Sequence, residues 1–134
     1  MQRKLIFFVI LVLNAGMLFA FISPISIKSF QATSEKEGIR LEWRLSNETE
    51  VISYEIFRKS ESGSQFYKLS DIVPNGSGVY QFMDDELYKN SSVETITYKL
   101  MIKSNSQNYE YFTSIMYQPT AVQRTWGSIK AMFK

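Results

Sequence analysis

The 134-residue sequence contains no cysteine and no histidine. Without cysteine the chain has no disulfide bond, no thiol nucleophile and no thiolate ligand for zinc. Without histidine it lacks the commonest general base and the commonest metal ligand. Carboxylate, lysine, tyrosine and hydroxyl groups remain, and no motif places them in a catalytic arrangement. We therefore expect a protein that is not an enzyme and that uses no metal or other cofactor.

A large charge of one sign is also absent, because 15 basic and 13 acidic residues nearly cancel. The charges are unevenly distributed. Arg3 and Lys4 stand at the start, and residues 120–134 hold three basic residues and no acidic one. Residues 27–119 are left with 10 basic and 13 acidic residues and a net charge of −3. Nucleic acid requires a basic face, so this mildly acidic domain is not expected to bind it.

The sequence has one long hydrophobic run, at its N-terminus. Residues 5–22 carry no charge and follow two basic residues, an order typical of an export signal. Residues 1–24 are therefore either a signal peptide, cleaved after a weak small-residue site at Ala20, or a retained signal anchor. As a helix, residues 5–22 would span roughly 27 Å, close to the thickness of a thin bilayer. Both interpretations predict an exported domain in the periplasm, at the cell surface or outside the cell, and the second anchors it in the inner membrane through residues 5–22.

Residues 25–118 predict one antiparallel β-domain. Apolar and polar side chains alternate with a period of two, which is the pattern of half-buried strands. The strands are expected at residues 25–33, 39–45, 51–59, 65–70, 79–83, 95–103 and 109–117. The side chains expected to face the core are Ile39, Leu41, Trp43, Leu45, Tyr54, Ile56, Ile96, Tyr98, Leu100 and Ile102. About seven short strands separated by turn residues are typical of a sandwich of two sheets.

Three consecutive acidic residues, Asp84, Asp85 and Glu86, follow the fifth expected strand. They suit a single helical turn at residues 84–88 with Asp84 as its N-cap, because the N-terminus of a helix favours negative charge. A calcium site is disfavoured, since the spaced oxygen ligands of a calcium loop are missing. Three other acidic residues could supply an acid–base pair: Glu48, Glu50 and Glu55. We expect them to be surface groups instead.

Several of these strand motifs resemble a known family. The Leu-Glu-Trp of residues 41–43, the Tyr-Glu-Ile-Phe-Arg of 54–58 and the Tyr-Lys-Leu of 98–100 are similar to fibronectin type III domains. The likeness is greater to the divergent copies in secreted bacterial proteins of the Bacteroidetes type, and it extends over about residues 27–118. It implies an immunoglobulin-like (fibronectin type III) sandwich. The matching residues are core positions, so the resemblance implies a fold and is silent on function.

After Pro119 the pattern changes from strand to helix. Thr120 suits the N-cap of a helix over the basic segment 119–134, and apolar residues at i, i+4, i+7 and i+11 share one stripe. One interpretation is that this stripe packs against its own sandwich. The other is that the segment docks to a protein partner or to an anionic membrane surface. The residues that would carry this docking are Val122, Arg124, Trp126, Ile129, Lys130, Met132 and Phe133.

Aromatic side chains are numerous in the predicted strands. Because neighbouring residues on a strand face opposite ways, we expect some of these rings to lie outside the core. Rings outside the core are candidates for stacking on carbohydrate. The aromatic residues considered are Phe57, Tyr67, Tyr109, Tyr111, Phe112 and Tyr117.

The sequence favours a non-enzymatic exported interaction module that docks through its C-terminal helix. The alternatives are a membrane-anchored accessory subunit of an envelope complex and a small carbohydrate-binding module.

Overall fold

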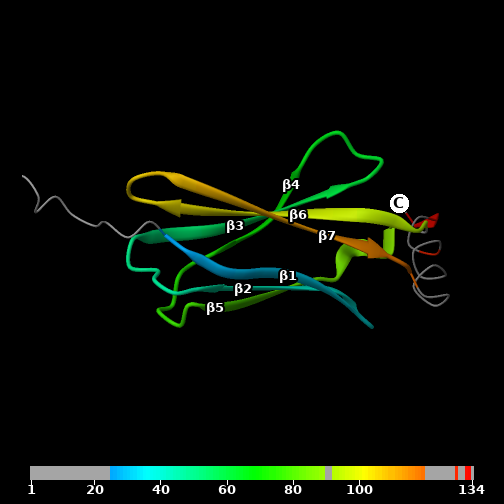
Figure 1. Cartoon of the computed structure of the whole chain (residues 1–134). Coiled ribbons are helices and arrows are strands. Elements are labelled where there is room, and N and C mark those ends of the chain that lie inside the picture. Colours follow the sequence, from blue (N-terminus) through cyan, green and yellow to red (C-terminus); the bar gives the residue numbers. More distant parts are fainter. Residues whose placement is uncertain (1–24, 90–91, 120–128, 130–131, 134) are drawn as a thin grey trace, which may run out of the picture.

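The computed structural model describes residues 25–89, 92–119, 129 and 132–133 (Figure 1). The predicted signal segment, residues 1–24, lies outside the described residues. The strands are β1 (Ile27–Glu35), β2 (Gly38–Leu45), β3 (Val51–Ser60), β4 (Tyr67–Ile72), β5 (Val79–Asp84), β6 (Glu94–Ser104) and β7 (Asn108–Tyr117). A short 3-10 helix, η2 (Glu86–Lys89), follows β5. Within the described residues, no helix has the length and hydrophobicity needed to cross a membrane.

The strands form two sheets that face each other as a sandwich (Figure 1). One sheet has the order β1-β2-β5 and the other has the order β4-β3-β6-β7. Each neighbouring pair is antiparallel. The prediction of an all-β, antiparallel sandwich of about seven strands is confirmed.

The core forms where the inward faces of the two sheets meet. All ten side chains that alternation places inward are buried. The Trp43 ring of β2 stacks on Tyr80 of β5, with 5.6 Å between ring centres, and lies 5.7 Å from Tyr54 of the opposite sheet. Aromatic side chains bury about 150–250 Å² each, so this trio connects both sheets through a large apolar contact.

The main differences from the sequence expectation concern β1, the start of β4 and the helical turn after β5. β1 begins and ends two residues later than predicted, because its pairing with β2 continues to the Glu35–Gly38 pair. β4 begins at Tyr67 instead of Gln65, since Phe66 leaves the strand and packs over the neighbouring strands. The expected helical turn is the short 3-10 helix η2, and Asp84 is the last residue of β5.

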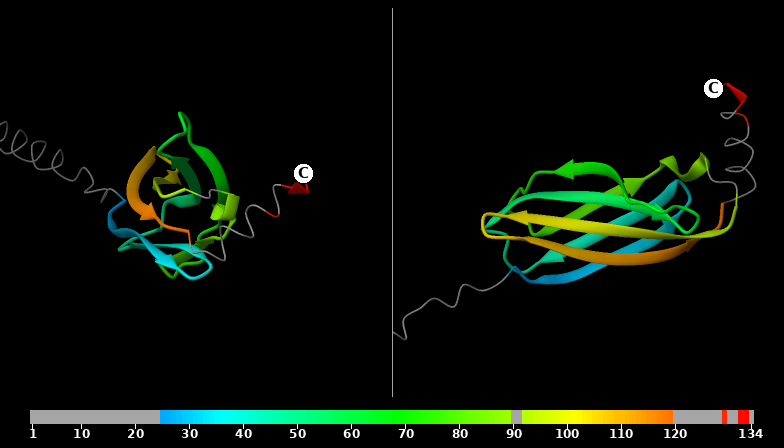
Figure 2. Two further views of the ribbon diagram at one scale, coloured as in Figure 1. Left: turned by 90° about the vertical axis from the view of Figure 1, so that its right-hand side faces the viewer. Right: turned by 90° about the horizontal axis from the view of Figure 1, so that it is seen from above.

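The chain enters and leaves the sandwich at opposite ends (Figure 2). The number of strands is odd and successive strands run back and forth along the long axis, so β1 begins at one end and β7 finishes at the other. A strand of ten residues, such as β7, spans roughly 33 Å. The segment after β7 therefore starts about that far from the segment before β1.

Candidate interaction surface

Three of the seven residues predicted to carry C-terminal docking are described, and all three are exposed. Ile129, Met132 and Phe133 have exposed fractions of 38%, 82% and 86%. The other four lie outside the described residues: Val122, Arg124, Trp126 and Lys130. Apolar side chains exposed together on one short segment offer a contact surface, because their transfer out of water is favourable.

A second group of apolar side chains lies on the outer face of the four-stranded sheet. Phe57 of β3 pairs with Lys99 of β6, and Lys99 pairs with Phe112 of β7, so the three form one row across the sheet. Their sequence neighbours face the core, and alternation therefore turns the row outward. The Lys99 ammonium lies 4.4 Å from the centre of the Phe57 ring and 3.7 Å from Oε1 of Glu110.

Phe66, from the connection between β3 and β4, packs over this row. Its ring centre lies 6.0 Å from that of Phe112. The Nζ atoms of Lys99 and Lys59 lie 5.0 Å and 5.3 Å from the Phe66 ring centre. An ammonium over an aromatic ring is attracted by about 0.5–1 kcal/mol at an exposed site. We call the following five residues the aromatic–lysine cluster: Phe57, Lys59, Phe66, Lys99 and Phe112.

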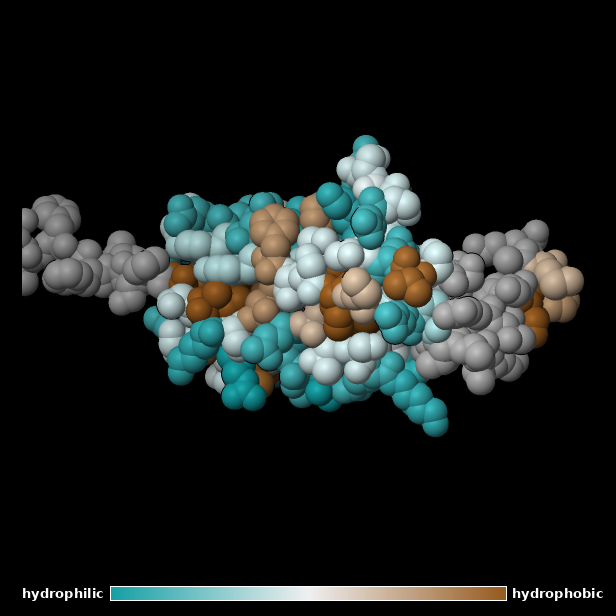
Figure 3. Space-filling model, turned by 45° about the vertical axis from the view of Figure 1, so that its right-hand side comes forward, coloured by the Kyte–Doolittle hydropathy of each residue, from teal (hydrophilic) through white to brown (hydrophobic). Residues whose placement is uncertain are grey.

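The exposed apolar groups of the sandwich form separate patches among hydrophilic side chains (Figure 3). Of the six aromatic residues considered for carbohydrate stacking, Tyr67 and Phe112 are exposed and Tyr117 is buried. The remaining three are half-buried: Phe57, Tyr109 and Tyr111. The expectation that some of these rings lie outside the core is confirmed.

Glu55 lies between two lysines on the same outer face. Its Oε1 atom is 2.9 Å from Nζ of Lys68 and 2.7 Å from Nζ of Lys103, and Lys68 also contacts Asp71 at 2.7 Å. Hydrogen bonds from Lys103 and Lys68 hold the pKa of Glu55 below its ordinary value. This carboxylate is therefore ionised at neutral pH and engaged in holding β3, β4 and β6 together.

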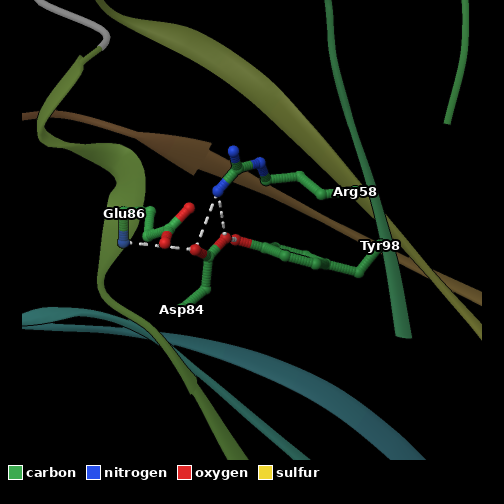
Figure 4. Close-up of polar contacts among 4 residues, drawn as sticks. All are labelled: Arg58, Asp84, Glu86 and Tyr98. Carbon is green, nitrogen blue, oxygen red and sulfur yellow. Dashed lines mark hydrogen bonds and ion pairs between the residues drawn. The ribbon is translucent and has the colours of Figure 1, made fainter. Parts of the chain in front are cut away.

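Asp84 is the centre of a buried polar network between the sheets (Figure 4). Nη1 of Arg58 lies 2.8 Å from both carboxylate oxygens, and the Tyr98 hydroxyl donates to Oδ2 at 2.6 Å. The Glu86 amide approaches Oδ1 at 3.4 Å, so Asp84 does contact the first residue of η2 as a cap would. Burial raises the pKa of Tyr98, and the negative charge of Asp84 raises it further.

A cleft of about 500 Å³ opens at the end of the sandwich where β1 begins, between the β2–β3 and β4–β5 connections. Glu48 lines it, accepting hydrogen bonds from the hydroxyls of Tyr54 at 2.8 Å and Tyr80 at 2.5 Å and from the Gly78 amide at 3.1 Å. Burial raises the pKa of Glu48, but the hydrogen bonds from Tyr80, Tyr54 and Gly78 outweigh this and leave it below its ordinary value.

These contacts determine what the carboxylates can do chemically. A general acid or base works best with a pKa near the working pH, whereas the pKa values of Glu48 and Glu55 are both lowered. The two residues bind different partners, and Glu50 is exposed. In the described part of the chain, no three carboxylates gather as a candidate metal site.

Sequence reasoning missed the partners of Asp84 and Glu48. For Asp84 a signal was present, since it is in phase with the inward residues Tyr80 and Phe82 of β5. Arg58 is likewise in phase with the inward residues of β3. Opposite charges at two core-facing positions predict a buried ion pair. Glu48 lies in a loop, where no periodicity indicates which way a side chain points.

Taken together, the fold and its surfaces define a small antiparallel β-sandwich domain with polar networks at both ends and exposed apolar groups on β7 and the C-terminal segment. No protein-family model, curated protein or solved structure matches the sequence.

Proposed function

We propose that this chain is a non-enzymatic, exported interaction module whose C-terminal segment docks to a protein partner. The observation that carries this proposal is the exposure of Ile129, Met132 and Phe133, which leaves these three apolar side chains of the docking segment available for contact. A short helix of this kind needs an apolar surface to pack on, because isolated helices of this length are marginal in water.

The sandwich itself is proposed to be of the fibronectin type III kind. The order β1-β2-β5 and β4-β3-β6-β7 supports this, since β4 pairs with β3. In the constant-type immunoglobulin arrangement the fourth strand instead joins the sheet of the first, second and fifth strands. Trp43, Tyr54 and Tyr98, which lie in the motifs that carry the resemblance, are fully buried and form the core such a fold requires.

The position of the C-terminal segment supports a protein partner over a membrane surface. If residues 5–22 are retained as an anchor, the bilayer lies at the end where β1 begins. The C-terminal segment starts at the other end, roughly 33 Å away. This separation also fits the alternative of a membrane-anchored accessory subunit, because the sandwich then acts as a spacer that holds the segment away from the bilayer.

The placement of exposed rings does not favour a carbohydrate-binding module. In the described residues the exposed rings of the sandwich are those of Tyr67 and Phe112, on β4 and β7. These are the two outer strands of a four-stranded sheet, so at about 4.8 Å per strand their backbones are roughly 14 Å apart. Among the described residues, the ring contacts include none between Tyr67 and Phe112, so these two exposed rings do not form one stacking platform.

A pair of matched variants tests the proposed function. In one, Ile129 and Phe133 are both replaced by serine, and in the control Val73 and Val79, which are also exposed, are replaced by serine. Partner association is measured by cross-linking and mass spectrometry on the native envelope, and stability is measured by thermal unfolding. We expect the first variant to lose its specific cross-links at an unchanged melting temperature, while the control keeps them.

Two results would contradict this function. If the first variant keeps its cross-links, the segment is not the docking element. If its melting temperature falls and its cross-links remain, the apolar stripe belongs to the core of its own domain.

A further inference from the structure

We propose that the aromatic–lysine cluster and the adjoining face of β7 form a second docking surface, which takes an acidic protein segment carrying apolar side chains. This surface lies on the outer face of the four-stranded sheet and is distinct from the C-terminal segment. Three features support the inference: an ammonium that pairs with no carboxylate of the described residues, a pair of exposed apolar side chains, and hydroxyl groups that already bond to each other.

Charge complementarity identifies an acidic occupant. The carboxylates on this face are each paired with a lysine: Glu55, Asp71 and Glu110. Lys59 differs, because its ammonium lies over the Phe66 ring and, among the described residues, contacts no carboxylate. An incoming carboxylate would complete this pairing, whereas the Lys59 ammonium repels basic partners.

The apolar part of the surface lies along β7. Phe112 and Met116 point outward with exposed fractions of 55% and 62%. They are four residues apart on one strand, a distance of roughly 13 Å. Ser114 lies midway between them, in the same row as Thr97 and Lys59. An extended segment along β7 can therefore place apolar side chains at both ends and a carboxylate between them, facing Lys59.

The polar groups of this face favour a protein segment over an acidic polysaccharide. Sugar hydroxyls need several open hydrogen-bonding groups, and the hydroxyls of Thr97 and Ser114 already use one donor and one acceptor in a bond to each other at 3.0 Å. Glu55 is already engaged by two lysines. Met116 is flexible and polarizable, a property that suits surfaces which adapt to apolar protein side chains.

The test is a fluorescence-anisotropy titration of the full chain with the labelled peptide Glu-Phe-Glu-Asp-Glu-Leu-Glu. Its two apolar residues are four positions apart, as Phe112 and Met116 are. We expect Lys59→Glu to weaken binding by about tenfold or more, because an attraction becomes a repulsion. The matched control is Lys28→Glu, an equal change of charge at an exposed position on β1 in the other sheet, and it should leave the affinity within about twofold.

The apolar part is tested with Met116→Ser and Phe112→Ser. Each should weaken binding of the same peptide, and circular dichroism checks that each variant is folded. If Phe112→Ser unfolds, Met116→Ser still decides the outcome, because Met116 lies outside the aromatic–lysine cluster.

Three results would overturn the proposal: equal affinities for Lys59→Glu and Lys28→Glu, equal binding of a peptide with lysine at each acidic position, or binding of polygalacturonate in preference to the peptide. A chain that ends at residue 119 should bind the peptide as the full chain does. The shortened chain therefore tests docking at this surface independently of the proposed docking through the C-terminal segment.

Discussion

At the scale of single residues, two carboxylates hold the ends of this sandwich. Asp84 neutralises Arg58 between the sheets near η2, and Glu48 joins two tyrosine hydroxyls at the opposite end. Asp84 is buried and Glu48 is half-buried, and each accepts several hydrogen bonds, which makes a charge tolerable away from water. Their roles are structural, and they explain how a domain without disulfide bonds fixes the positions of its connections.

Asp84→Ala should be among the most destabilising single substitutions in the domain. It leaves Arg58 without its carboxylate, and breaking a buried ion pair from one side costs about 3–5 kcal/mol. The matched control is Asp85→Ala, because Asp85 is adjacent and exposed, and surface changes usually stay within about 0.5 kcal/mol. Urea unfolding of both variants measures the difference, and equal losses would contradict the role assigned to Asp84.

Stability should fall as the pH drops below about 4.5, the ordinary pKa of glutamate. The pKa values of Glu48 and Glu55 are lowered in the folded chain, so between the unfolded and folded pKa values the unfolded chain binds more protons. Their contribution to stability is present above pH 4.5 and is lost as the pH falls through the folded values. Urea midpoints between pH 3 and pH 7 should show a shallower acid loss for Glu55→Gln, whereas Glu50→Gln, at an exposed position, should follow the parent chain.

At alkaline pH the stability of the domain depends on buried tyrosines, whose pKa values are raised on folding and not lowered. Burial raises the pKa values of Tyr54 and Tyr98, and the neighbouring carboxylates raise them further. Above pH 10 the unfolded chain loses these protons while the folded chain keeps them, so stability should fall as the pH rises. Tyr98→Phe should flatten this loss while lowering stability at neutral pH, because the hydrogen bond to Asp84 is removed. A slope identical to that of the parent chain would contradict the assignment.

At the scale of elements, close approach between strands decides where glycine is required. Gly38 begins β2, and a Cβ atom there would overlap the carbonyl oxygen of Asp84 at the end of β5. Gly76 also has a positive φ, of 84°, but has open space around it. Gly38→Ala should therefore cost at least about 3 kcal/mol, from backbone strain and overpacking together, and Gly76→Ala only about 1–2 kcal/mol. Thermal unfolding distinguishes them, and similar losses would show that β5 can move aside.

The sequence predicted strands better than contacts, and the reason is physical. Alternation in β2 and β6 is a local pattern, so the inward sets of both strands were predictable from residues 39–45 and 95–103. Contacts such as Glu48 to Tyr80 join residues 32 positions apart and depend on how two loops fold. The start of β4 was mispredicted for a related reason, because Phe66 packs on residues that lie far away in the sequence. Likewise, Lys59 and Phe112 both contact the Phe66 ring only because the register of β3, β6 and β7 brings their rows side by side.

At the scale of the whole molecule, charge and chain direction act together. The sandwich carries a net charge of −3 and the final 15 residues carry +3, and β7 finishes at the end of the sandwich opposite to the start of β1. Opposite charges attract, so charge alone would draw this segment toward the acidic domain, whereas the exposure of Ile129, Met132 and Phe133 leaves those three apolar side chains available to other molecules. We accordingly propose that the sandwich is a stable support and that the C-terminal segment makes the principal contact with the partner.

The most direct test compares the full chain with a chain that ends at residue 119, by thermal unfolding and by cross-linking in the native envelope. We predict the same melting temperature for both chains, because the hydrophobic core of the described residues lies within residues 25–117. We also predict that the shortened chain loses its cross-links to the partner. A lower melting temperature with the cross-links retained would contradict it, because the final segment would then be part of the domain core and the partner would bind elsewhere.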